Sequence, residues 1–228
     1  MPSLALFLVA SLIVVGLGLS AWDWYHAWRG HDRRVSKLAP MYLIIGAVLV
    51  VMMHVNGVPT LGLVSLGLWW YLAGVVASII GDAFLLPPTQ FVPGLAAFLV
   101  AHVCLSVYFW HHAAWLPPGV IGLTGTLVAA VVFAIVPGLT FVRHVPRREF
   151  VPVLCYLLAI AFMVVTAVNT ANPLIIAGAA LFALSDYLLA RERYVPDSRV
   201  TSVHVMTTYH VAQWCFLLAT ALRVGILS

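Results

Sequence analysis

The sequence predicts an all-α fold, a bundle of about eight helices that cross a membrane. Three observations lead to it: an apolar composition, span-length apolar segments, and basic residues confined to certain connections. Of the 228 residues, 64% are hydrophobic and 8% are charged, whereas about 25% of residues are charged in soluble domains. A soluble domain of this composition would lack the polar residues to cover its surface. We therefore expect a single integral membrane domain over residues 1–228.

Eight apolar segments are separated by Pro, Gly, Asn and charged residues. Their lengths are near the roughly 20 residues that a membrane-spanning helix needs. None has the alternation of a barrel strand, so we expect helices. No Lys or Arg precedes the first segment, which favours a retained span over a cleaved signal peptide. The segments are residues 3–22, 38–55, 60–86, 93–112, 118–142, 150–168, 173–191 and 203–226.

Ten of the eleven Lys and Arg residues occupy the first, fifth and seventh connections, and the second, fourth and sixth contain none. The one exception is Arg223, near the outer end of the last span. Because basic residues collect on the cytosolic side, this predicts a cell-membrane protein with both termini outside the cytosol. The net charge of +4 then faces lipid headgroups, and we expect no nucleic-acid partner. These residues are Arg29, Arg33, Arg34 and Lys37; Arg143, Arg147 and Arg148; and Arg191, Arg193 and Arg199.

A faint repeat relates residues 81–86 to residues 185–190, each with an Asp at its second position. Each half of the chain would then contain four spans, which suggests a parallel four-plus-four arrangement.

Two of the seven acidic residues, Asp82 and Asp186, lie inside apolar segments, about one helical turn from their cytosolic ends. An ionised carboxylate there is unfavourable unless it is paired or faces a cavity. We predict that both carboxylates face one polar site and work as acid and base; the alternative is that they hold helices together. We expect water to solvate the other five acids, which are Asp23, Asp32, Glu149, Glu192 and Asp197.

Further polar side chains lie within or beside the spans. Tyr209, His210 and Gln213 are three to four residues apart and share a helical face, while Lys37 can reach a lipid phosphate. A lone buried His such as His102 is more often a core residue whose hydrogen bonds are satisfied than a residue that binds a ligand. No metal-ligand spacing of His or Cys occurs, so we expect no metal or other cofactor. The candidate substrate-binding residues are Lys37, Ser78, His102, Ser185, Tyr209, His210 and Gln213.

Taken together, these residues resemble the YhhN family of multi-pass membrane proteins, which includes the lysoplasmalogenases. The resemblance covers most of the chain, and the sequence departs from the family pattern at Leu38, Leu105 and His210. Its marks are Lys37 and Pro40; Gly81 and Asp82; Phe91, Gly94, Phe98, Ala101 and His102; Gly178, Ala179, Phe182, Ser185 and Asp186; and Tyr209, Ala212 and Gln213.

The resemblance implies hydrolysis of the vinyl ether bond of a lysoplasmalogen or related lysophospholipid. The products would be a fatty aldehyde and a glycerophospho-ethanolamine or -choline. One of Asp82 and Asp186 would protonate the vinyl ether, and the other would stabilise the cation and activate water, as paired carboxylates do in glycoside hydrolysis. Which acid does which stays open, as does the oligomeric state.

Two other functions use acids within spans. A proton-coupled transporter or lipid-binding membrane protein would use the same acids as a relay, and this alternative stays open. An intramembrane aspartyl protease is disfavoured because Ile79 stands where its Gly-x-Gly-Asp pattern has the first Gly.

Overall fold

The computed structural model describes residues 2–31, 33–56, 62–112, 142–196 and 198–227. Within these ranges it contains seven long helices and no strand, which confirms the all-α prediction. Two short 3₁₀ turns lie at Pro88–Gln90 and Val142–His144. The helices are α1 (Pro2–Arg29), α2 (Ala39–Asn56), α3 (Gly62–Phe84), α4 (Phe91–His112), α7 (Arg147–Val168), α8 (Pro173–Tyr194) and α9 (Ser202–Arg223).

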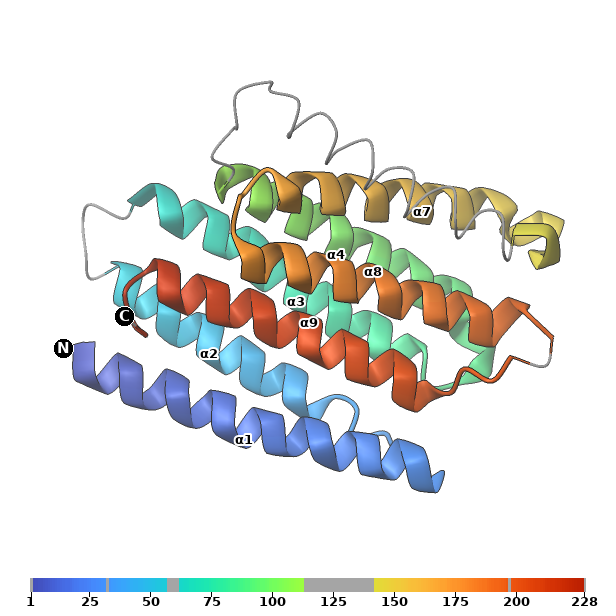
Figure 1. Ribbon diagram of the computed structural model, residues 1–228, viewed down its shortest axis with the longest axis horizontal. Coiled ribbons are helices and arrows are strands. Elements are labelled where there is room, and N and C mark those ends of the chain that lie inside the picture. The colour runs from blue at the N-terminus through green and yellow to red at the C-terminus, as the bar shows by residue number, and fades with distance from the viewer. Residues whose placement is uncertain (1, 32, 57–61, 113–141, 197, 228) are drawn as a thin grey trace.

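The helices lie side by side in one bundle, with both chain termini at the same end (Figure 1). Six of the seven, all but α9, are long and apolar enough to cross a membrane by length and composition. The predicted segment 118–142 falls almost wholly outside the described residues. The count of eight spans and the four-plus-four repeat therefore stay predictions.

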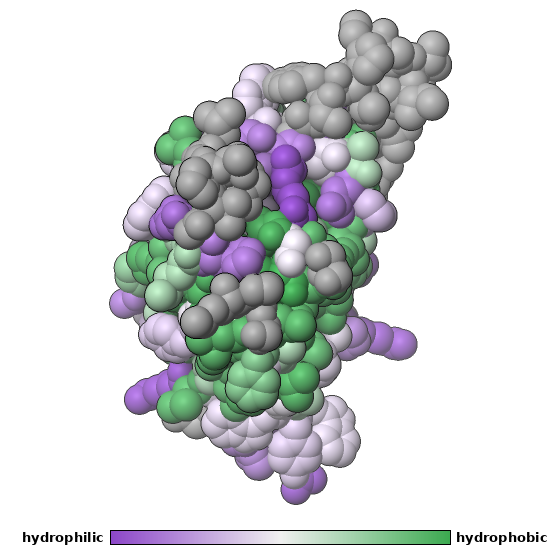
Figure 2. Space-filling model, turned by 90° about the vertical axis from the view of Figure 1, so that its left-hand side faces the viewer, coloured by the Kyte–Doolittle hydropathy of each residue, from purple (hydrophilic) through white to green (hydrophobic). Residues whose placement is uncertain are grey.

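Large apolar side chains point outward from the bundle. Phe7, Val14 and Met53 are 67%, 69% and 76% exposed. Figure 2, which views the end of the bundle where the termini lie, shows hydrophobic side chains over much of the described surface. A soluble monomer rarely presents so much apolar surface, whereas a lipid environment favours it. The surface agrees with a multi-pass membrane protein.

The end of the bundle opposite the termini carries most of the basic residues, whereas Arg223 lies in the last turn of α9 near the C-terminus. The last turn of α1, the first residues of α7 and the last turn of α8 all lie at the end opposite the termini (Figure 1), and each contains Arg. The structure thus gathers the basic connections at one end, as the charge pattern requires. The assignment of that end to the cytosol stays a prediction.

Local sequence signals set the limits of α8. The Asn172 side-chain oxygen accepts hydrogen bonds from the backbone N–H groups of Leu174 and Ile175, at 3.0 and 3.3 Å, as an N-cap residue does. Arg191 and Arg193 lie in the last turn, where they complement the helix dipole, and α8 continues to Tyr194. Asp186 therefore lies eight residues, or about two helical turns, before the end of α8. The sequence predicted a distance of about one turn, and that prediction was wrong.

Two glycines allow neighbouring helices to approach closely. A Cβ atom on Gly81 of α3 would lie 2.6 Å from the ring of Phe98 on α4. One on Gly178 of α8 would lie 2.6 Å from the ring of Phe216 on α9. The α3–α4 and α8–α9 pairs are the most extensive helix contacts of the described chain. Gly81 directly precedes Asp82, so this contact fixes the face on which Asp82 lies.

Two acids that we expected water to solvate are buried. Asp23 on α1 is fully buried and pairs with Arg33, and Glu149 on α7 is 6% exposed and accepts a hydrogen bond from the Tyr194 hydroxyl. The prediction failed because a carboxylate near a helix end can be buried when a partner satisfies it. Glu192 is exposed as predicted, while Asp32 and Asp197 lie outside the described residues.

Candidate functional site

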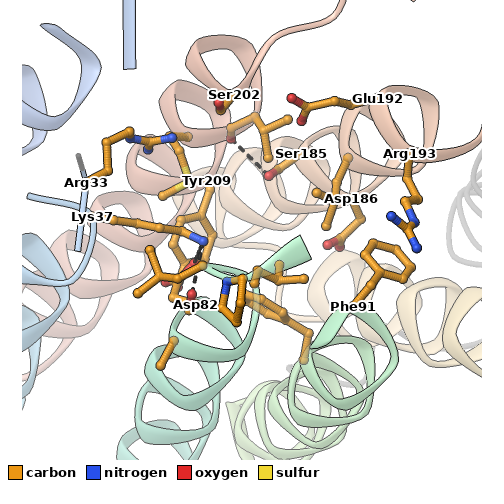
Figure 3. A pocket seen from close by; sticks show the side chains of 18 of the residues that line it. Arg33, Lys37, Asp82, Phe91, Ser185, Asp186, Glu192, Arg193, Ser202 and Tyr209 are labelled. Atoms are coloured by element: carbon orange, nitrogen blue, oxygen red, sulfur yellow. Dashed lines mark hydrogen bonds and ion pairs between the residues drawn. The ribbon is translucent and has the colours of Figure 1, made fainter. Parts of the chain in front are cut away.

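A cavity of about 1030 Å³ opens at the basic end of the bundle (Figure 3). Its walls come from the α1–α2 connection, the end of α3, the start of α4, the second half of α8 and the first half of α9. Both Asp82 and Asp186 line it. The structure therefore brings the two carboxylates that the sequence singled out to one cavity.

Asp82 pairs with the lysine that begins the second predicted span. The Lys37 ammonium nitrogen lies 3.1 Å from Asp82 Oδ1 and 3.2 Å from the Asp82 backbone oxygen. Both side chains are almost fully buried, and Figure 3 shows the Lys37 nitrogen directed at Asp82. This is a buried ion pair, whose loss of hydration must be offset by its mutual attraction and its hydrogen bonds.

Asp186 has two partners on other helices. The Tyr156 hydroxyl on α7 donates a hydrogen bond to Asp186 Oδ1 at 2.7 Å. His102 on α4 places its Nε2 atom 3.0 Å from Asp186 Oδ2, a close contact without ideal hydrogen-bond alignment. Side chains from α4, α7 and α8 thus meet at one carboxylate.

The other ring nitrogen of His102 indicates which tautomer the ring adopts. His102 Nδ1 lies 2.6 Å from the backbone oxygen of Phe98, and a carbonyl oxygen only accepts, so Nδ1 carries a proton. A neutral ring would then present a lone pair on Nε2 to a carboxylate oxygen 3.0 Å away. The contact is favourable only with a proton between them, on the imidazole or on the carboxyl group. A proton on either atom would make this contact a hydrogen bond.

Tyr209 on α9 lies between the polar groups of the site. Its hydroxyl lies beside the Asp82 carboxylate and Ser78, and it also feels the charge of Asp186. It has no hydrogen bond of ordinary geometry to any of these residues. Tyr209 lines the cavity, whereas Ser78 is fully buried behind it. A phenol so placed can donate to Asp82 or to a molecule in the cavity.

The other predicted binding residues lie in three different places. Ser185 lines the cavity, but its hydroxyl donates to the Val205 backbone oxygen at 3.0 Å and so joins α8 to α9. His210 is fully buried and stacks on Trp24 at 6.4 Å between ring centroids. Gln213 is also fully buried. Neither His210 nor Gln213 is among the residues that line the cavity.

The sequence analysis did not identify Tyr156. A tyrosine in the middle of an apolar span is itself a signal, because a buried phenol hydroxyl needs a hydrogen-bonding partner. The sequence could not indicate which of the buried acids that partner is. No group of three or more His, Cys, Asp or Glu within the described part of the chain could hold a metal ion.

An apolar groove between α4, α7 and α8 adjoins the cavity. Asp186, Phe91 and Leu189 line both. Elsewhere the groove is lined mainly by apolar side chains, among them Leu95, Val153, Leu157, Ile160 and Ala183. Its free space is only about 30 Å³, so a chain could enter only if lining side chains moved. Asp186 therefore lies where a polar cavity meets an apolar groove.

Comparison with known proteins assigns the chain to a family. Residues 32–220 match the sequence profile of the YhhN family. The chain belongs to the YhhN family. This confirms the resemblance drawn from the sequence, and the matched range contains both carboxylates of the cavity, Asp82 and Asp186.

Several curated relatives of this YhhN protein bear the same name. The chain is 34% identical over 154 residues to Lysoplasmalogenase TMEM86B of Homo sapiens, covering 65% of this chain and 62% of the relative. It is 29% identical over 150 residues to the Lysoplasmalogenase of Mycobacterium bovis, covering 63% and 57%. The chain thus spans less than two thirds of the length of these relatives. No solved structure matches the chain significantly.

Proposed function

We propose that this YhhN protein hydrolyses the vinyl ether bond of lysoplasmalogens or a closely related lysophospholipid. Two relatives named lysoplasmalogenase support the reaction class. The observation that carries the proposal is the place of Asp186, at the junction of the polar cavity and the apolar groove.

This junction matches the chemistry of the substrate. In a lysoplasmalogen the vinyl ether joins a polar glycerophospho group to a long hydrocarbon chain. With the polar part in the cavity and the chain along the groove, the vinyl ether would lie beside Asp186. Proton transfer needs the donor within hydrogen-bonding distance of the atom that receives the proton, and this placement would meet that condition.

The reaction consumes one water molecule. A proton is added to the β-carbon of the vinyl ether, and the α-carbon and ether oxygen then share the positive charge as an oxocarbenium ion. Water adds to the α-carbon and loses a proton, which gives a hemiacetal. The hemiacetal breaks its bond to the glycerol oxygen, which leaves as an alcohol, and a fatty aldehyde remains.

The partners of the two carboxylates suggest their roles. Asp186 lies 3.0 Å from His102, whose imidazole can both accept and donate a proton. We assign the proton donor to this pair. Asp82 is paired with the Lys37 ammonium, so its negative charge has a cationic partner. We assign to Asp82 the stabilisation of the cation and the activation of water, with Tyr209 orienting that water.

The test is aldehyde release by the purified protein in detergent, given a lysoplasmalogen. We expect release by the wild type and almost none by Asp82→Asn or Asp186→Asn. The matched control is Glu149→Gln, which changes a buried carboxylate that lies outside the cavity and should leave release unchanged. Full activity in both Asp variants would rule out the acid–base assignment.

The same protein tests the carrier alternative. If the wild type releases no aldehyde from vinyl ether substrates but exchanges lysophospholipid between the leaflets of a vesicle, transport replaces hydrolysis as the function. Aldehyde release without exchange supports the hydrolase.

A further inference from the structure

The connection between α1 and α2 contains an arginine that the proposed reaction does not use. Arg33 binds Asp23 with two parallel contacts, Nε to Oδ1 at 3.0 Å and Nη2 to Oδ2 at 2.6 Å. The Ser36 hydroxyl donates to the same Asp23 Oδ1 at 2.8 Å. Asp23 is fully buried in the bundle. A two-point contact to a buried carboxylate fixes both the position and the orientation of the guanidinium plane.

The fixed guanidinium lies at the cavity wall. Arg33 lines the cavity, and its side chain is 14% exposed. A guanidinium has five N–H groups, and the contacts with Asp23 use one on Nε and one on Nη2. Three N–H groups therefore remain in the same plane, in a fork that matches a carboxylate or a phosphate. Figure 3 shows Arg33 on the Lys37 side of the cavity, away from Asp186.

The charges around the opening favour an anion. Lys37 pairs with Asp82, so the negative charge of this acid has a cationic partner. Among the residues that line the cavity, four are Lys or Arg, and three are acids, of which Glu192 is the third. Asp23, which balances Arg33, does not itself line the cavity. The opening thus presents positive charge to a ligand.

We propose that Arg33, oriented by Asp23, binds the phosphate of the lipid headgroup. The ligand class is a phosphodiester that carries a hydrocarbon chain, and the identity of the lipid rests on the proposed function. Lys37 was the phosphate ligand that the sequence suggested, but its ammonium already contacts two Asp82 oxygens. Arg33 has its remaining donors prearranged at the cavity wall, and such preorganisation lowers the entropy lost on binding.

The experiment measures binding without turnover. The probes are an alkyl-ether lysophosphatidylethanolamine, which has no vinyl ether to cleave, and the alkylglycerol with the same chain. The purified full chain in detergent is titrated with each. We expect the wild type to bind the phospholipid more tightly. Arg33→Gln should weaken phospholipid binding about tenfold, as loss of a charge-assisted contact does, and leave alkylglycerol binding unchanged.

Two further variants separate positioning from folding. Asp23→Asn should weaken phospholipid binding by less than Arg33→Gln, because the cation remains but loses its fixed orientation. The double variant Asp23→Asn/Arg33→Gln leaves no buried charge unpaired and should bind the phospholipid as weakly as Arg33→Gln. The matched control is Arg29→Gln, which changes an arginine of the same end that does not line the cavity and should bind as the wild type does.

Three results would overturn the proposal. The first is that the wild type binds the two probes with equal affinity. The second is that both variants that contain Arg33→Gln prefer the phospholipid as strongly as the wild type does. The third is that inorganic phosphate displaces the lipid at concentrations below that of the lipid. The last would identify a site for free phosphate and not for a headgroup. A wild type that binds as expected but releases no aldehyde from lysoplasmalogen would refute the proposed hydrolysis and leave the phosphate site standing.

Discussion

The two carboxylates of the cavity differ in what surrounds them. Asp82, near the end of α3, is paired with a lysine ammonium. Asp186, farther from the end of α8, is contacted by a histidine ring and a tyrosine hydroxyl. Asp82 thus faces a cationic side chain, whereas Asp186 faces two side chains that can donate a proton. Two residues of the same type in one cavity can therefore serve different steps of a reaction.

The difference teaches that partners, more than the acid itself, decide the role. Lysozyme-type chemistry likewise assigns two carboxylates to two roles by their environments. If the comparison is correct, changes on the Asp186 side should reduce proton transfer, and changes on the Asp82 side should affect stability as well as activity.

The largest effect should follow Asp186→Asn. The amide can still accept from Tyr156 and donate to His102, so the fold should persist, but it cannot take up or release a proton. We expect aldehyde release to fall by about a hundredfold to ten-thousandfold, the usual contribution of general acid catalysis. Release is measured at saturating lysoplasmalogen, with thermal unfolding as the control for folding. A decrease of less than tenfold would mean that the proton comes from elsewhere.

Lys37→Met tests the other side of the comparison. It leaves a buried Asp82 carboxylate without its cation, which should lower the free energy of unfolding by about 3–5 kcal/mol. Chemical unfolding in mixed micelles measures the change. The double variant Lys37→Met/Asp82→Asn should recover most of the stability and none of the activity. Lys37→Met protein as stable as the wild type would show that the ion pair has no structural role.

Tyr156→Phe should have a smaller effect, confined to the Asp186 side. The variant removes one hydrogen bond to Asp186 and leaves His102 in place. A hydrogen bond to a charged group contributes about 1.5–3 kcal/mol, and we expect aldehyde release to decrease about tenfold or more. The comparison uses the double variant Asp82→Asn/Tyr156→Phe. Tyr156→Phe should lower the stability of the Asp82→Asn variant no more than it lowers the stability of the wild type.

The sequence predicted the helices and the two acids but not the contacts that differentiate them. Hydropathy along the chain is a local property, so the approximate positions of the spans could be read from it, and an acid within a span is conspicuous. The exact helix limits could not, since α1 continues to Arg29 and α8 to Tyr194. The contacts of Lys37 with Asp82 and of Tyr156 with Asp186 join residues that are 45 and 30 positions apart. Such pairings depend on how the helices rotate and pack, which a single sequence does not encode in any local pattern.

Buried acids beside connections show the same limit. Asp23 is next to a basic, polar connection, and the composition of that connection alone predicts that Asp23 is exposed to water. Only the folded connection brings Arg33 and Ser36 back onto the carboxylate. The same reversal of the chain places Arg33 at the cavity, although the charge pattern of the sequence had assigned this residue to the membrane surface.

The smallest effect should follow Ser185→Ala, beside the more consequential Asp186. The sequence placed Ser185 among the substrate-binding residues, but its hydroxyl donates to the Val205 backbone oxygen across the α8–α9 contact. Its loss should lower the free energy of unfolding by about 0.5–1.5 kcal/mol and change KM for lysoplasmalogen by less than twofold. A large increase in KM with unchanged stability would instead make Ser185 a substrate ligand. It would also extend the binding site along α8 from Asp186 toward α9, on the side of the cavity that Tyr209 already occupies.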